Sequence, residues 1–151
     1  MVTDAANNVY VTGSAQGSLD GQVWSGFPDG FVQKYDVSGA KLWTRQFGTN
    51  KSDAGSDIVL DAAGDLLISG STGGSLDGNV SAGGYDLFVT RYTAAGVKQG
   101  THQRGTVEDE NETFVAALTD GTPVVAATTD GKFAANKVTG TDIIAAVLCA
   151  P

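Results

Sequence analysis

The sequence predicts an all-β fold built from β-propeller blades, each a four-stranded antiparallel sheet. The first observation is an internal repeat, because residues recur at a fixed spacing of 57 positions. The second is that runs of Val, Thr and aromatic residues are separated by Gly, Asp and Asn, as in strands joined by tight turns. The matched positions are Gly13 and Gly70, Asp20 and Asp77, Asp29 and Asp86, Gly39 and Gly96, and Gly48 and Gly105.

The repeat divides the 151 residues into three units, 1–52, 53–109 and 110–151. The third unit is a decayed copy, in which Gly121 matches Gly64 and Asp142 stands opposite Asp86 once one residue is deleted. The chain therefore contains about two and a half to three blades. Since propellers typically use four to eight blades, we expect a partial propeller that self-associates or belongs to a longer protein.

The second unit contains all four expected strands. Residues 56–61 form the first strand, and a glycine-containing turn at 62–65 leads into the second, at 66–71. Residues 85–92 form the third, and 97–105 a weaker fourth, whose counterpart in the first unit is 40–48. Stacking on the next unit covers the apolar faces of such a sheet. A parallel β-helix has a shorter repeat, and an immunoglobulin-like sandwich needs no internal identity, so both are less favoured.

The segment "DAANNVYVTGSAQGSLDGQVWSGFPDGFVQKYDVSGAKLWTRQFGT" (4–49) resembles the bacterial SBBP family of β-propeller repeats. The likeness continues through the second unit, where "LWTRQFGT" has become "QGTHQRGT", and survives only in outline in the third. The resemblance implies propellers in secreted or cell-surface proteins. It implies no agreed activity and no catalytic residues.

Charge and composition limit the kinds of partner that the chain is expected to bind. The net charge is −8 and the pI about 4.3, with no basic patch, so we expect no nucleic-acid binding. No stretch is apolar for 18 residues, so no membrane span is predicted, and the opening residues do not resemble a secretion signal. The expectation of an extracellular or cell-surface location therefore rests on the resemblance alone. Cys149 is the only cysteine, which excludes an internal disulfide and disfavours a cysteine-based zinc site.

The loop "GSLDG" occurs twice and carries Asp20 and Asp77. We expect Asp-Gly to form a turn in which the aspartate accepts a hydrogen bond from its own backbone two residues on. A calcium-binding loop is the alternative, because Ca²⁺ prefers oxygen ligands, but no EF-hand pattern is present. In the same irregular region, Trp24 and Tyr85 are candidates for stacking on a sugar. These four residues are the candidate ligand-binding set.

Other repeated residues are assigned to the architecture. Asp29, Asp86 and Asp142 precede an apolar strand in each unit, where they fix a turn or bond a neighbouring blade, and Asp4 and Asp61 begin turns. Alternate spacing on strands places five aromatic residues in the core: Tyr10, Phe31, Tyr35, Trp43 and Phe47.

No catalytic residue, cofactor or metal site is predicted. His102 is the only histidine and has no second histidine, nucleophile or paired carboxylates to act with, so we interpret it as an ordinary strand residue. The predicted function is a non-enzymatic extracellular or cell-surface propeller segment that serves as a scaffold or binds a protein or carbohydrate. The alternative is a part of a propeller enzyme acting on polysaccharide, which the symmetry of the shared loops disfavours.

Overall fold

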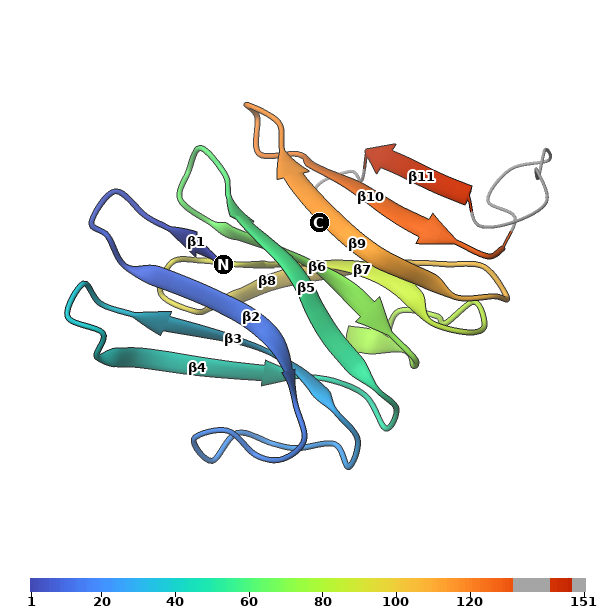
Figure 1. Ribbon diagram of the computed structural model, residues 1–151, viewed down its shortest axis with the longest axis horizontal. Coiled ribbons are helices and arrows are strands. Elements are labelled where there is room, and N and C mark those ends of the chain that lie inside the picture. Colours follow the sequence, from blue (N-terminus) through green and yellow to red (C-terminus); the bar gives the residue numbers. More distant parts are fainter. Residues whose placement is uncertain (132–141, 148–151) are drawn as a thin grey trace.

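The protein consists of three antiparallel β-sheets that follow one another in chain order (Figure 1). A computed structural model describes residues 1–131 and, for the backbone alone, residues 142–147. One short 3-10 helix, η1 (Leu76–Gly78), is the only helical segment within these ranges. No helix there is long and apolar enough to cross a membrane. The all-β prediction is confirmed.

Each sheet is built from one repeat unit. The first contains β1 (Val2–Thr3), β2 (Val9–Ala15), β3 (Asp29–Tyr35) and β4 (Lys41–Phe47), in that order across the sheet. The second contains β5 (Asp53–Leu60), β6 (Leu66–Thr72), β7 (Asp86–Tyr92) and β8 (Lys98–Arg104), also in chain order. The third contains β9 (Glu110–Ala117), β10 (Pro123–Thr129) and β11 (Asp142–Val147), with β10 in the middle. Four antiparallel strands in each of the first two units agree with the sequence analysis.

In the first two sheets, the hairpin between the first two strands begins at an aspartate, as expected for Asp4 and Asp61. The Asp4 carbonyl accepts from the Asn7 amide at 2.9 Å, and its carboxylate accepts from the Ala6 amide at 2.9 Å. Further hydrogen bonds, led by that from the Asn8 side chain, lower the pKa of Asp4 to about 2. In the second unit the Asp61 carbonyl accepts from the Gly64 amide at 3.0 Å. These backbone bonds close the turn and set the register of both strands.

The core between the first and second sheets is aromatic and aliphatic. Side chains alternate between the two faces of a strand, so each sheet has a front face, turned toward the following sheet, and a back face, turned toward the preceding one. Tyr10 and Val32 on the front of the first sheet pack with Leu66 and Ile68 on the back of the second, all with no exposed surface. The two sheets are therefore held together mainly by apolar burial.

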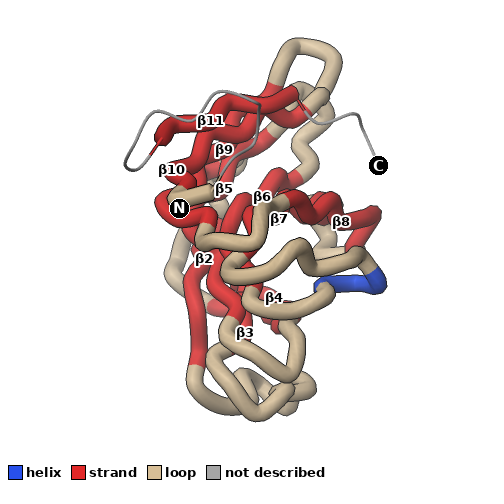
Figure 2. The backbone as a smooth tube through the Cα atoms, turned by 90° about the vertical axis from the view of Figure 1, so that its right-hand side faces the viewer, coloured by secondary structure: helices blue, strands red, loops and turns tan. Residues whose placement is uncertain are grey.

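The second core repeats this arrangement between the second and third sheets. Leu67, Leu87 and Val89 on the front of the second sheet pack with Val115 and Val125 on the back of the third. Figure 2 shows the resulting order along the molecule, with β2 and β3 at one end and β9 to β11 at the other. The middle sheet is thus buried on both faces, while each outer sheet has one face without a neighbour among the described residues.

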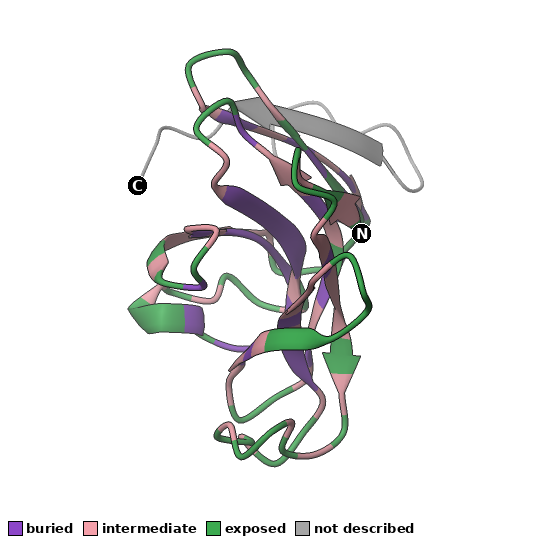
Figure 3. Ribbon diagram, turned by 90° about the vertical axis from the view of Figure 1, so that its left-hand side faces the viewer, coloured by how far each residue is buried: buried purple, intermediate pink, exposed green. Residues whose placement is uncertain are grey.

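The five aromatic residues assigned to the core do not share one environment. Tyr10 and Phe47 are buried, and Trp43 packs against the same cluster. Phe31 and Tyr35 are only half-buried and belong to neither core cluster, so their assignment to the core was wrong. They lie on the back of the first sheet, which no other sheet of the described chain covers. Figure 3 shows burial concentrated in the middle of the molecule.

Candidate functional site

The repeated "GSLDG" loop folds in the same way in both copies. Asp20 and Asp77 each adopt a left-handed backbone conformation with φ of 51°, and the glycine that follows also has positive φ. The turn closes through a bond from the Gln22 amide to the Leu19 carbonyl at 2.9 Å, and from Asn79 to Leu76 at 3.0 Å. Asp-Gly is favoured where two consecutive residues need positive φ. The predicted turn is confirmed.

The side chains of these aspartates do not bond their own backbone, which corrects the expectation from sequence. Asp20 accepts from Lys41 Nζ at 2.6 Å and from Thr44 Oγ1, both on β4. Asp77 accepts from Lys98 Nζ and Thr101 Oγ1 on β8, each at 2.5 Å. Because the left-handed turn aims the carboxylate at the outermost strand, the partner lies more than 20 residues away. The bond from Lys41, followed by that from Thr44, lowers the pKa of Asp20.

Trp24 and Tyr85 are partly exposed, as a stacking role requires, but they do not form one site with the aspartates. Trp24 is 47% exposed, and its indole Nε1 donates to the Phe27 carbonyl at 2.6 Å. Tyr85 is 37% exposed and lies before β7, in a different unit. Asp20 and Asp77 are likewise bonded to different sheets. The candidate ligand-binding residues are therefore spread over two units.

Asp29 and Asp86 occupy the first position of β3 and β7 and have no exposed surface. Oδ2 of Asp29 accepts from the Ser25 amide at 3.1 Å and from Gln46 Nε2 at 2.9 Å. Asp86 accepts from the Ala82 amide and from Gln103 in the same way. Each carboxylate thus fastens the loop before its strand to the outermost strand. Asp142 begins β11, and its side chain lies outside the described residues.

A second buried carboxylate accompanies each of these aspartates at the junction between sheets. Asp53, the first residue of β5, accepts from the Thr49 amide and from the hydroxyls of Thr49 and Thr72. Glu110, the first residue of β9, accepts in the same way from Thr106 and Thr129. The backbone amides of Asp53 and Glu110 donate across the junction to the Pro28 and Tyr85 carbonyls, at 2.7 and 2.6 Å. The junction is therefore polar at this end and apolar along its length.

The second carboxylate oxygen of Asp86 has no hydrogen-bond partner in the described part of the chain. This Oδ1 crowds the position that a Cβ on Gly105 would occupy, and Glu110 Oε2 lies 2.6 Å from the same point. The equivalent atom of Asp29 is also buried and unpaired, beside Gly48. Only glycine leaves room for the paired carboxyl groups. Gly48 and Gly105, which follow the fourth strand of their sheets, therefore make room for the buried carboxylates at the junction.

A change in the slope of stability with pH is expected for Asp53→Asn. Burial, and then the charge of Asp29, raise the pKa of Asp53 above its usual 3.8, against the opposing hydrogen bonds. The folded state therefore favours the protonated acid, and the contribution of this group to stability falls as pH rises through the raised pKa. Asparagine has no ionisation cost. Urea unfolding at about pH 4 and about pH 7 should show that the free energy of unfolding of the variant rises relative to that of the wild type at the higher pH.

Asp36→Asn is the matched control, with the opposite sign. Hydrogen bonds from Ser38, first its side chain, lower the pKa of Asp36, so this group stabilises the fold above its ordinary pKa and loses that effect in acid. The free energy of unfolding of the Asp36 variant should fall relative to that of the wild type as pH rises. Parallel slopes for the two variants would show that burial does not control Asp53.

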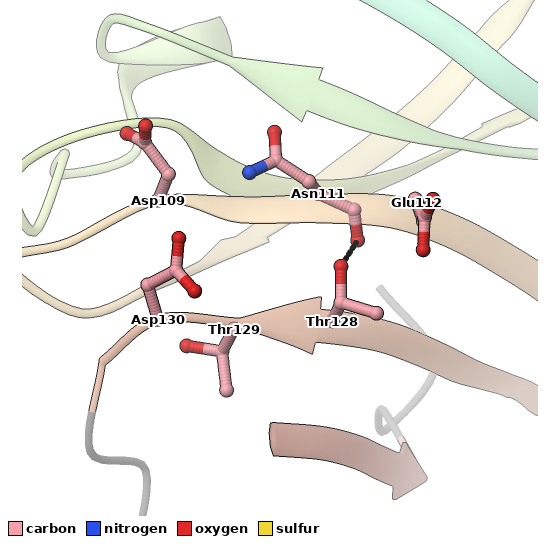
Figure 4. Close-up of a pocket in the computed structure, with 6 residues that line it drawn as sticks. All are labelled: Asp109, Asn111, Glu112, Thr128, Thr129 and Asp130. Atoms are coloured by element: carbon pink, nitrogen blue, oxygen red, sulfur yellow. Dashed lines mark hydrogen bonds between the residues drawn. The ribbon is translucent and has the colours of Figure 1, made fainter. Parts of the chain in front are cut away.

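A polar hollow of about 310 Å³ lies in the third unit at the junction end of β9 and β10 (Figure 4). Asp109, Asn111 and Glu112 line it from β9 and the residue before it. Thr128, Thr129 and Asp130 line it from the end of β10. The Thr128 hydroxyl donates to the Asn111 carbonyl at 3.1 Å, and Thr129 is turned to Glu110. Three carboxylates of the hollow are exposed or half-exposed, so its charge is negative.

The hollow is where the third sheet and its flanking residues differ from the matching positions around the second sheet. Five of its six lining residues are larger than the residues 57 positions earlier. Asp109 stands in place of Ser52, Asn111 of Ala54, Glu112 of Gly55, Thr128 of Ser71 and Asp130 of Gly73, while Thr129 matches Thr72. Pairing shifts between Ala126 and Thr128, and Glu112, opposite this irregularity, has φ of 47°. In the second unit a Cβ on Gly55 would overlap Thr12 of the first sheet.

Sequence reasoning missed this hollow because it weighed the residues that the copies share. The signal was available in the differences, since four positions at this site carry Asp, Asn, Glu and Asp where the positions 57 residues earlier carry small side chains. Shared polar residues turned out to be engaged in turns and junctions. What the sequence could not indicate was that residues 109–112 and 128–130 lie side by side at one end of the sheet.

The described lining of the hollow consists of Asp, Asn, Glu and Thr side chains. His102 is on β8 opposite Val89, and its Nε2 is buried without a hydrogen-bond partner in the described ranges. Among those residues, no group of three or more His, Cys, Asp or Glu side chains is placed to hold a metal ion. Cys149 falls outside them. The chemistry offered by the hollow is hydrogen bonding and attraction of positive charge.

Chelation by EDTA is expected to leave the melting temperature nearly unchanged. The Asp20 and Asp77 carboxylates already accept from lysine and threonine, so they are not free to bind Ca²⁺. A calcium site filled at one hundred times its dissociation constant would add about 2.7 kcal/mol of stability. Calorimetry with and without EDTA measures this difference. A drop of several degrees, restored by added calcium, would contradict the structural role of the two loops.

Comparisons with known proteins include a partial similarity. No family model matches the chain. The chain is similar to Regulatory protein FlaEY of Caulobacter vibrioides, with 29% identity over 134 residues that cover 80% of this chain. The matched region is 14% of that protein's length.

Proposed function

We propose that this chain is a non-enzymatic segment of a β-propeller at the cell surface or outside the cell, where it binds a protein or carbohydrate ligand. The observation that carries the proposal is the contrast between shared and divergent residues. Shared loop residues are occupied by internal hydrogen bonds. The polar hollow lined by Asp109, Glu112 and Asp130 differs from the matching positions around the second sheet and is open, although Asp109 also accepts from the Tyr85 amide at 2.9 Å. An open polar surface that differs between the copies can serve recognition.

The propeller itself is supported by the way the sheets follow one another. The first two sheets have four antiparallel strands in chain order, and successive sheets pack face to face through equivalent residues. That is the relation between neighbouring blades. The surface location rests on the resemblance of residues 4–49 to SBBP repeats. The similar Caulobacter protein is named a regulatory protein, and the match covers 14% of its length.

The hollow favours a ligand that carries positive charge. Three carboxylates and the Asn111 amide surround an opening wide enough for a side chain or a sugar ring. Carboxylates bind lysine and arginine through charge-assisted hydrogen bonds, which are stronger than bonds to neutral hydroxyls. A basic protein segment is therefore favoured over a neutral glycan.

The test is a binding and turnover screen on the purified chain. Basic peptides, neutral glycans and acidic glycans are titrated by calorimetry, and the products are analysed for cleavage. We expect stoichiometric binding of a basic peptide, no cleavage, and loss of binding in Glu112→Ala with Asp130→Asn. Cleavage of a polysaccharide would establish the enzymatic alternative.

Asp120→Asn serves as the control, because Asp120 is an exposed turn residue of the same unit outside the hollow. It removes the same charge as Asp130→Asn. Equal weakening by both changes would mean that net charge, and not the hollow, accounts for binding. Raising the ionic strength should weaken binding to the hollow.

A further inference from the structure

The two sheet junctions use one recurring pair of faces. The front of the first sheet covers the back of the second, and the front of the second covers the back of the third. On the covered back of the second sheet, Leu66, Ile68 and Phe88 have no exposed surface and Tyr92 has 3%. Phe47 of the first sheet meets the Phe88 ring edge to face, with the ring centroids 5.6 Å apart.

The back of the first sheet carries the same kind of residues, and no other sheet of the described residues covers it. Val9, Val11, Phe31 and Tyr35 stand 57 positions before the four buried side chains of the second sheet. All four are half-buried and lie outside both core clusters. The Phe31 ring already sits over Gly13, as Phe88 sits over Gly70. The face is thus formed as in an occupied junction, and a complementary sheet face would bury it.

The complementary front face is present on the described strands of the third sheet. Phe114 and Ala116 on β9 are exposed, Phe114 by 60%, and Val124 on β10 is half-buried. Ala116 and Val124 stand 57 positions after Val59 and Leu67, which are part of the second junction. Phe114 is the counterpart of Asp57, whose carboxylate accepts from the Val115 amide across that junction at 3.1 Å. One chain therefore presents both halves of a junction at opposite ends.

We propose that the back of the first sheet is a docking surface for a second copy of this chain, which covers it with the front of its third sheet. The contact continues the established junctions from one molecule to the next. Because it joins two different surfaces, it is head-to-tail, and it closes a ring if the rotation between sheets permits. The inference does not depend on any ligand of the polar hollow.

Charge sets how this association responds to salt. Each copy has a net charge of −8, so two copies repel one another while the docked faces are apolar. Raising the ionic strength screens the repulsion and leaves the apolar contact intact. The association should therefore tighten with salt, opposite to the response of a basic ligand at the hollow. This difference separates failure of the docking inference from failure of the proposed function.

The experiment is sedimentation equilibrium and light scattering of the 151-residue chain across micromolar concentrations. The wild type should show a species at least twice its 15.4 kDa mass. Phe31→Glu on the back face and Phe114→Glu on the front face should each raise the dissociation constant at least about tenfold, because a carboxylate would be buried unpaired. A mixture of the two variants should associate again, since each retains the face that the other lacks.

Val97→Glu is the matched control, because Val97 is 57% exposed in a turn of the second unit, away from both faces. It should leave the association unchanged. Circular dichroism confirms folding, and Val11→Lys replaces Phe31→Glu if the latter does not melt cooperatively. A strictly monomeric wild type, or association that persists in both face variants, would overturn the proposal, as would equal weakening by the control.

Discussion

Replacing Phe88 with alanine is expected to lower the free energy of unfolding by about 3–5 kcal/mol. Phe88 is in the middle of the second sheet, has no exposed surface, and packs against Phe47 of the first sheet. Its ring also fills the space above Gly70, where a larger residue would collide with the Ala54 carbonyl. Truncation would therefore leave a cavity between two sheets whose backbones cannot easily close on it.

Urea unfolding followed by tryptophan fluorescence measures the change. Phe27→Ala is the control, because Phe27 is 56% exposed in a loop and its removal should cost no more than about 0.5 kcal/mol. If Phe88→Ala cost as little as the control, the first two sheets would not be held together by this aromatic contact.

The second large effect is expected for Arg91→Ala, at about 3 kcal/mol. Arg91 on β7 forms an ion pair with Asp61, whose side chain is only 2% exposed, and donates to the Gly121 carbonyl of the third unit at 2.5 Å. Removing the guanidinium leaves a buried carboxylate without its counter-charge and frees the turn of the third unit. Amides of Ala63 and Asp65 still donate to Asp61, which places the effect at the low end for buried pairs.

The repeat supplies the control for this prediction, because Lys34 stands at the equivalent position of the first unit. Its Nζ is 3.9 Å from Asp4, and the Asp4 side chain is 22% exposed. Lys34→Ala should therefore cost about 1 kcal/mol or less. Thermal or urea unfolding of the two variants compares ion pairs at the same repeat position whose carboxylates are buried to different degrees. Equal costs would mean that burial of the carboxylate does not govern the Arg91 pair.

Much of the local structure could be predicted because it depends on residues close in sequence. The Asp-Gly turns at Asp20 and Asp77, the turns that begin at Asp4 and Asp61, and the four strands of the second unit all follow from turn chemistry and alternation. The spacing of 57 residues also indicated that the units are equivalent. The partners of Asp20 could not be predicted, since Lys41 and Thr44 reach it only when β4 pairs beside β3.

The sequence by itself determined the all-β class, the repeat and the order of strands, because short-range sterics and periodicity specify these. Only the tertiary structure decided which face of each sheet is covered, and therefore that Tyr10 is buried while Phe31 is not. It also brought Asp109 and Asp130 to one hollow across a hydrogen-bonded pair of strands. Alternation along a strand divides its residues between the two faces of the sheet. Which face is buried depends on the neighbouring sheet, and the sequence of one strand does not specify that neighbour.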